Sequence, residues 1–438
     1  MHRLNSWLLA ASLAATSTQA EAAPVLFAET QTLRISDPGP GDDLGYSLGT
    51  GGGMLIAGAI NVKDHQGRSV GAAYVYSPDA TGQWIETAVL RPDDGQHNDA
   101  FGMTSDIYGL TAVVGVPWNN ALGDSSGAAY VFASDDARGW QQRVKLVAPD
   151  GKRNEYFGGA VAISGSVIAV GANLHQDSPA PGVPKPKGAV YLYANDAQHN
   201  WSFTQKLQPQ DVGYGDGFGR ALDIYGDTLV ATSHPADPRF AWQGGAAYIF
   251  KKDAEAWTQV AKLVPDDPLG GGAFATDVSL NEGRLLVGTL PLGRDDIRGT
   301  AYIYEEDSTG QWIQTARLVP HDIDQRWYFG SEVTLFGDYA AVTAYSSPHG
   351  PIDPVTYLFQ RDSIGTWTEI ATLTSAAAGS SFGYTLAAAD GQLFVSSGIN
   401  GPGAVHVFSQ VPEPAGLLLA LGGLACTAMR RAPHSRPA

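Results

Sequence analysis

The stretch from Asp99 to Asp150 reads DAFGMTSDIYGLTAVVGVP (99–117), a polar loop, GAAYVF (127–132), a short acidic turn and WQQRVKLVAPD (140–150). Seven versions of it align on an aromatic or apolar residue followed by a small one: Leu44-Gly45, Phe101-Gly102, Phe157-Gly158, Phe218-Gly219, Phe274-Ala275, Phe329-Gly330 and Phe382-Gly383. Successive versions start 57, 56, 61, 56, 55 and 53 residues apart. Repeats of about this length, with several short strands in each, are typical of a β-propeller.

Each of the first six repeats contains four strand patterns. The first two strands are joined by tight turns that contain glycine, such as Ser164-Gly165 and Asp390-Gly391, and the second strand is a continuous apolar run, as at 167–170. The third is rich in β-branched and aromatic residues, as at 188–193, and the fourth alternates, as at 140–146. The sequence therefore predicts an all-β, seven-bladed propeller of four-stranded antiparallel blades.

The last repeat lacks a fourth strand. It begins at Phe382, passes through its third strand at 405–408 and ends there. The segment FAETQTL at 27–33 has the spacing of a fourth strand such as WIETAVL at 84–90, yet it precedes the first repeat. We predict that this N-terminal strand completes the last blade and closes the ring, because closure removes exposed sheet edges.

The repeated FG, the turn after the first strand and the GAAYVF-like strand resemble FG-GAP repeats, the blades of integrin α-subunit propellers and of many bacterial surface proteins. The resemblance covers residues 24–410 and implies one propeller domain with a binding or adhesion role. It departs from the family in lacking a D-x-D-x-D-G calcium loop. Calcium is therefore not implied by the resemblance.

Both ends of the chain look like export signals. Residues 1–22 combine Arg3, an apolar run and small-residue cleavage sites, which predicts a secretory signal peptide. Residues 411–438 resemble a PEP-CTERM sorting signal, with Pro412, Glu413 and Pro414 before an apolar segment and Arg430 and Arg431 after it. The resemblance implies an exosortase-type processing enzyme as partner and placement in the inner membrane, on the cell surface or outside a Gram-negative bacterium. The alternative is a hydrophobic tail that packs on the propeller.

Composition restricts the partners. The net charge is −17 and the isoelectric point about 4.8, which argues against nucleic acid and against anionic membranes, except through the C-terminal segment. The single cysteine, Cys426, lies in that segment, so an intrachain disulfide cannot form.

No catalytic residue is predicted. Gly45-Tyr46-Ser47-Leu48-Gly49 fits the G-x-S-x-G pattern of serine hydrolases, but no helix follows it and it falls on the first strand of a repeat. H-E-x-x-H and paired C-x-x-C motifs are absent from the sequence.

The loops between strands two and three, and those between strand four and the next blade, vary in length and emerge on one face of the ring, which we call the variable face. Acidic residues recur there, and Asp93, Asp94 and Asp99 are the candidate ligands of a Ca²⁺ ion, the one candidate cofactor. The alternative is that aspartate serves turn geometry and solubility.

Aromatic residues also gather in these loops. Trp118, Trp242 and Trp327 occupy no repeat position, and tyrosines accompany them: Tyr156, Tyr214 and Tyr345. Exposed aromatic rings are typical of binding sites and stack on sugar faces. The alternative is that each tryptophan caps the hydrophobic core of its blade.

We therefore predict an exported, non-catalytic cell-surface or matrix protein that binds an exopolysaccharide or a surface protein. One alternative is a surface hydrolase or lyase with its active site at the centre of the variable face. The other is a purely structural matrix component. Carboxylates or histidines converging at the channel mouth would favour the enzyme.

Overall fold

The computed structural model describes residues 26–135, 138–175, 187–196, 200–213, 215–234, 244–254, 256–266, 272–291, 299–322, 328–345, 354–375, 381–398 and 400–411. Residues 27–410 form one compact unit. The predicted signal peptide, and the tail residues Pro412, Glu413, Pro414, Arg430 and Arg431, lie outside the described residues.

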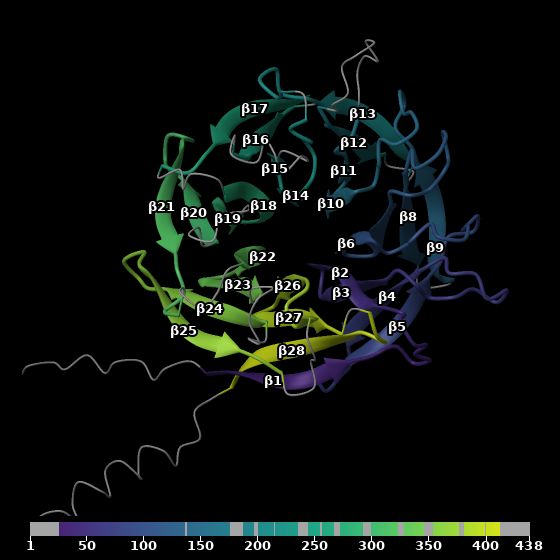
Figure 1. Ribbon diagram of the computed structural model, residues 1–438, viewed down its shortest axis with the longest axis horizontal. Helices are drawn as coiled ribbons and strands as arrows, with labels where there is room; N and C mark the ends of the chain where they lie inside the picture. The colour runs from purple at the N-terminus through teal and green to yellow at the C-terminus, as the bar shows by residue number, and fades with distance from the viewer. Residues whose placement is uncertain are drawn as a thin grey trace, which may run out of the picture. The chain divides into compact units, whose positions relative to one another are not determined.

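Across the described ranges, seven four-stranded sheets are arranged as blades around a central axis (Figure 1), which confirms the predicted propeller. The strands of blades one to four are β2 (Leu44–Gly51), β3 (Met54–Ala59), β4 (Ala72–Pro78), β5 (Trp84–Leu90), β6 (Thr104–Tyr108), β7 (Thr111–Val116), β8 (Ala128–Asp135), β9 (Gly139–Leu146), β10 (Ala160–Ser164), β11 (Val167–Ala172), β12 (Ala189–Asn195), β13 (Trp201–Leu207), β14 (Leu222–Tyr225), β15 (Thr228–Ser233), β16 (Ala246–Asp253) and β17 (Ala256–Leu263). Those of blades five to seven are β18 (Gly272–Asn281), β19 (Arg284–Pro291), β20 (Thr300–Glu306), β21 (Trp312–Leu318), β22 (Tyr328–Phe336), β23 (Tyr339–Tyr345), β24 (Val355–Arg361), β25 (Trp367–Leu373), β26 (Leu386–Ala389), β27 (Gln392–Ser397), β28 (Ala404–Val411) and β1 (Leu26–Leu33).

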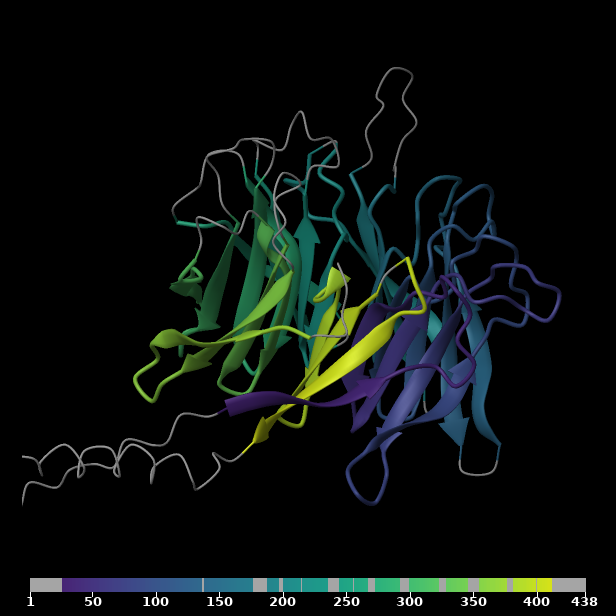
Figure 2. The same ribbon diagram turned by 60° about the horizontal axis from the view of Figure 1, so that its bottom comes forward.

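The N-terminal strand closes the ring as predicted. The last sheet has the order β1-β28-β27-β26, so β1 is the outer strand of blade seven, and it lies beside β28 in both views (Figures 1 and 2). Side-chain contacts repeat across this junction. Gln31 on β1 bonds the backbone N–H and C=O of Trp84 on β5 at 2.9 and 2.7 Å, and Gln205 on β13 bonds those of Trp257 on β17 at 2.9 and 2.8 Å. The junction between blades seven and one therefore has the same glutamine–tryptophan contacts as the junction between blades three and four.

The first residue of each FG pair holds neighbouring parts of the ring together. Its ring or side chain is buried in every blade, and in blade three Phe157 packs edge-on against Tyr191 of β12, with ring centroids 5.6 Å apart. Phe157 also forms a parallel bridge with Gly127, the residue before β8 in blade two. A Cβ on Gly127 would lie 2.0 Å from the Phe157 carbonyl oxygen, so glycine is required for this close approach. Gly403 and Leu44 form the same bridge across the closing junction.

The outer strands contain a β-bulge, which the alternating sequence pattern of the fourth strands did not predict. In blades one to six the pairing of the third and fourth strands shifts by one residue, as between Val131 and Phe132 of β8 opposite β9. Such a β-bulge increases the local twist and bends the outer strand. The alternating burial is still present: Trp84 and Leu90 at the two ends of β5 are buried, whereas Ile85 and Val89 are exposed.

Candidate functional site

Of the aromatic residues predicted for the variable face, Trp118 is confirmed to be exposed. It follows β7, and 42% of its surface is accessible. Tyr156 precedes β10, is half-buried and has a positive φ of 55°. Tyr345 ends β23 and donates a hydrogen bond to the Gly383 carbonyl at 3.0 Å, so its hydroxyl is engaged within the protein. Trp242, Trp327 and Tyr214 lie outside the described residues.

The three candidate calcium ligands take part in contacts within the protein. Asp99 is buried, and its Oδ2 accepts hydrogen bonds from the Gln96 amide at 2.9 Å and from Asn119 Nδ2 at 3.0 Å. Asp94 accepts from the Tyr130 hydroxyl at 2.7 Å and pairs with Lys145 at 2.6 Å.

Asp93 uses its backbone instead, and its amide donates to Gln142 Oε1 at 3.0 Å. Within the described ranges, no group of three or more histidine, cysteine, aspartate or glutamate side chains is placed to hold a metal ion. The contacts of Asp94 and Asp99 are those expected of residues that fix loops and join blades.

Ser47 of the G-x-S-x-G pattern lies within strand β2, as its repeat position predicts. Its buried hydroxyl donates to the Gly102 carbonyl at 2.9 Å and contacts the Ser105 hydroxyl at 2.7 Å. The side chain therefore connects blades one and two.

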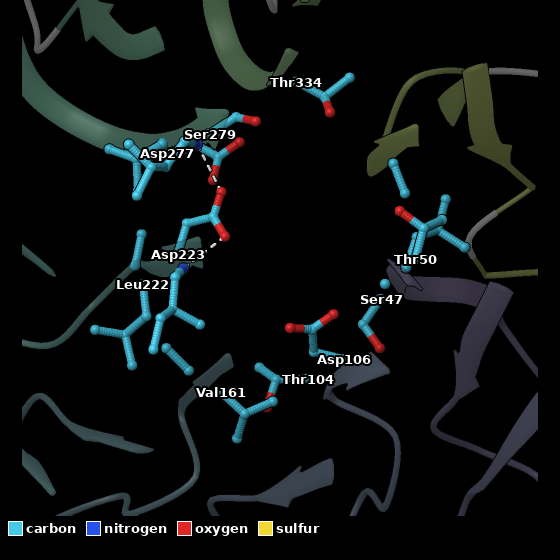
Figure 3. Close-up of a pocket in the computed structure, with 18 of the residues that line it drawn as sticks. Ser47, Thr50, Thr104, Asp106, Val161, Leu222, Asp223, Asp277, Ser279 and Thr334 are labelled. Atoms are coloured by element: carbon cyan, nitrogen blue, oxygen red, sulfur yellow. Dashed lines mark hydrogen bonds between the residues drawn. The ribbon is translucent and has the colours of Figure 1, made fainter. Parts of the chain in front are cut away.

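A channel runs along the ring axis, where the sequence placed the alternative enzyme site without naming any of its residues. It forms a cavity of about 750 Å³ lined by the first strand of every blade, β2, β6, β10, β14, β18, β22 and β26. Its lining is polar, with hydroxyl groups such as Thr104 and Thr334 beside carboxyl groups (Figure 3). Ligand pockets typically have volumes of about 300–1,000 Å³.

Among the described residues, four carboxyl groups line this channel, and three of them accept backbone hydrogen bonds across a blade junction. Asp106 on β6 accepts from the Ile163 amide of β10, and Asp277 on β18 from the Val333 amide of β22, both at 2.8 Å. Asp223 on β14 accepts from the Leu280 amide of β18 at 2.6 Å (Figure 3). These amides belong to the innermost strands, which have no further strand to pair with. The aspartates thus satisfy donors that would otherwise face the channel.

Burial raises the pKa of these carboxyl groups. The pKa of Asp106 rises to about 8 and that of Asp223 to about 6, despite the amide bonds that favour the ionised form. The pKa values of Asp277 and Glu332 are also raised, by burial and, for Glu332, by the nearby charge of Asp277. The channel consequently retains protons near neutral pH.

A sequence signal for this channel exists but is weak. Asp106 and Asp223 both stand five residues after the phenylalanine of their FG pair, and Asp277 and Glu332 both stand three residues after theirs. Acidic residues at fixed positions of the innermost strand indicate the channel only once the fold places those strands around the axis.

Five segments of the chain match the FG-GAP repeat family model: residues 84–132, 140–193, 201–250, 257–304 and 312–359. Since these cover more than half of the sequence, the chain belongs to the FG-GAP repeat family. Each match begins at the fourth strand of one blade and ends in the third strand of the next. The remaining parts of the ring, including β1 and blade seven, are outside the matches but have the same four-stranded form.

Other comparisons add little. No curated protein matches the chain. A crystal structure of a protein from Lactobacillus plantarum is similar over 75% of this chain and 84% of that one, with 13% sequence identity and a TM-score of 0.44, values at which the likeness carries no functional argument. Within the residues that the structure describes, no helix is long and apolar enough to cross a membrane.

Proposed function

We propose that the protein is exported and acts at the cell surface or in the extracellular matrix as a non-catalytic binding protein, with an exopolysaccharide as its ligand. The observation that carries the proposal is Trp118. Among the described tryptophans, the others open the fourth strands, where Trp84, Trp257 and Trp312 are buried. Trp118 instead leaves much of its indole in solvent on the variable face. An exposed ring on a rigid scaffold offers a large contact area at low entropic cost.

The proposed location rests on the two ends of the sequence. A signal peptide at 1–22 would deliver the chain across the inner membrane, and the tail at 411–438 would be recognised by an exosortase-type enzyme. A protein sorted in this way meets exopolysaccharide at the surface of the cell, which makes a glycan the first ligand to test and a surface protein the second.

A glycan array probed with the purified ring, residues 24–410, tests the binding function. We expect Trp118→Ala to weaken binding to the glycans that the ring retains by about 1–3 kcal/mol, without loss of folding. Phe203→Ala is the matched control, because Phe203 is an equally exposed aromatic residue, at 42%, but lies on outer strand β13. A variant that melts earlier while its folded fraction binds normally would make Trp118 a packing residue.

A second candidate is a hydrolase or lyase active in the channel. It is favoured by Glu332 and Asp277, which lie on adjacent inner strands and have raised pKa values, as a general acid requires. Incubation of array-positive glycans with the ring should release no new reducing ends or unsaturated products. Product release that is lost in Glu332→Gln would establish the enzyme instead.

The third candidate, a purely structural matrix component, predicts a negative array and cell-surface retention without a ligand.

A further inference from the structure

Arg220 occupies an unusual position at the variable-face end of the channel. It stands two residues after Phe218 and two residues before the start of β14, and it contributes to the channel lining. The equivalent positions in the neighbouring blades three and five hold the smaller residues Gly159 and Thr276.

The guanidinium of Arg220 forms no ion pair or side-chain hydrogen bond with any described residue, although other cations of the ring do. Lys145, Lys206 and Lys262 each pair with an aspartate at 3.0 Å or less. Burial lowers the pKa of Arg220, although the residue is still exposed. Its N–H donors are therefore open to an anion, which would form charge-assisted hydrogen bonds with the guanidinium.

A second polar group near Arg220 also lacks a partner. His234 follows β15, and its Nδ1 is buried without a hydrogen bond in the described part of the chain. Burial and the charge of Arg220 lower its pKa to about 4, so the imidazole is neutral at neutral pH. A neutral imidazole can donate one hydrogen bond and accept one. An unsatisfied polar atom in a buried position is costly, and a polar ligand would satisfy it.

Two aromatic residues occupy the positions equivalent to Arg220 on the far side of the ring. Tyr46 belongs to blade one and Tyr384 to blade seven, and their ring centroids lie 5.2 Å apart with an interplanar angle of 52°. Both residues are half-buried, and Tyr46 is one of the residues that line the channel. Tyrosine faces of this kind stack on the apolar face of a sugar ring.

We propose that this end of the channel binds a uronic-acid residue of a polysaccharide, with the sugar carboxylate on Arg220 and the sugar ring against Tyr46 and Tyr384. The inference rests on the proposed glycan-binding function and specifies the class of sugar. Glu332, which has no hydrogen-bond partner among the described side chains, lines the channel one residue further along its strand and accepts hydrogen bonds from sugar hydroxyls. Because the pKa of Asp106 is raised to about 8 and that of Asp277 is also raised, the four carboxyl groups of the channel carry fewer than four full charges near neutral pH and oppose an anion correspondingly less.

Isothermal titration calorimetry with trigalacturonate tests the proposal, with fully methyl-esterified trigalacturonate as the uncharged probe. The ring should bind the acid at least about 10-fold more tightly than the ester, since a guanidinium–carboxylate pair is charge-assisted and bidentate. Arg220→Gln should abolish that difference and leave ester binding unchanged. Arg220→Lys should restore part of it, because an ammonium retains the charge but not the fork geometry.

Arg143→Gln is the matched control, because Arg143 lies on outer strand β9, pairs with Asp135 at 3.3 Å and is remote from the channel. It should retain the full preference for the acid. Equal affinity for acid and ester, or a preference for the acid that is retained in Arg220→Gln, would overturn the uronic-acid inference. The proposed glycan-binding function would not be affected if the array is positive. A ring that binds neutral glycans on the array but neither trigalacturonate probe would also overturn the inference, while the proposed glycan-binding function would be retained. A ring that binds no glycan at all would overturn both proposals.

Discussion

At the scale of single residues, the channel aspartates combine two roles that oppose each other. Each accepts a backbone amide from the next blade, a contact that joins two inner strands. Each also carries its carboxyl group in surroundings that disfavour the charge, so its pKa is raised. A group whose pKa is higher in the folded than in the unfolded chain stabilises the fold while it is protonated, and this stabilisation is lost as the pH rises.

For Asp106 this stabilisation is lost as the pH rises from the pKa in the unfolded chain, 3.8, through the pKa in the folded chain of about 8. His234, whose pKa falls from 6.5 to about 4, has the opposite effect but only below pH 6.5. We therefore expect the melting temperature of the ring to fall between about pH 6.5 and 8.5, and Asp106→Asn to make that fall shallower.

Asp94→Asn is the control for this measurement, because the contacts of Asp94 with Lys145 and Tyr130 lower its pKa below the usual value, so it titrates far below the window. It should leave the slope above pH 6.5 unchanged. A wild-type melting temperature that rises steadily from pH 6.5 to 8.5 would mean that Asp106 is already ionised.

At the scale of elements, β1 is the strand on which closure depends. It is far from β28 in sequence, yet it supplies the outer edge of blade seven and the contact with blade one through Gln31. Deletion of residues 26–34 should lower the melting temperature more than truncation after Gln410, because the deletion exposes the edge of β28 and removes the junction. Equal effects of the two truncations, measured by calorimetry on the purified proteins, would count against a ring that depends on β1.

The glutamine contacts provide a finer test of the junction. Gln31→Ala and Gln205→Ala each remove two hydrogen bonds to a tryptophan backbone, so each should reduce the free energy of unfolding by about 1–3 kcal/mol in urea titrations. The two losses should agree within about 0.5 kcal/mol. A loss for Gln205→Ala alone would show that the closing junction contributes less than an internal one.

At the scale of the whole molecule, the ring is a scaffold that presents the variable face and the adjacent end of the channel, and our proposals place the ligand there. The export hypothesis concerns the ends of the chain. We expect removal of residues 411–438 to shift the protein from the membrane fraction to the soluble exported fraction, because Arg430 and Arg431 would otherwise hold the tail with its positive end inside. Alanine replacement of Arg3 in the signal peptide should instead slow export. Fractionation that is unchanged by loss of the tail would contradict the anchor.

The sequence by itself determined the propeller, the number of blades and the closing strand. These follow from local patterns, such as the spacing of Phe101 and Phe157 and the likeness of residues 27–33 to a fourth strand, because each repeat encodes its own strands and turns. It also indicated an exposed aromatic residue at Trp118. Only the tertiary structure brought Arg220 of blade four opposite Tyr46 of blade one, and Asp106 against the Ile163 amide of the next blade. Such contacts join residues from different repeats around the axis, and their chemistry arises from burial and from partners that no single repeat contains.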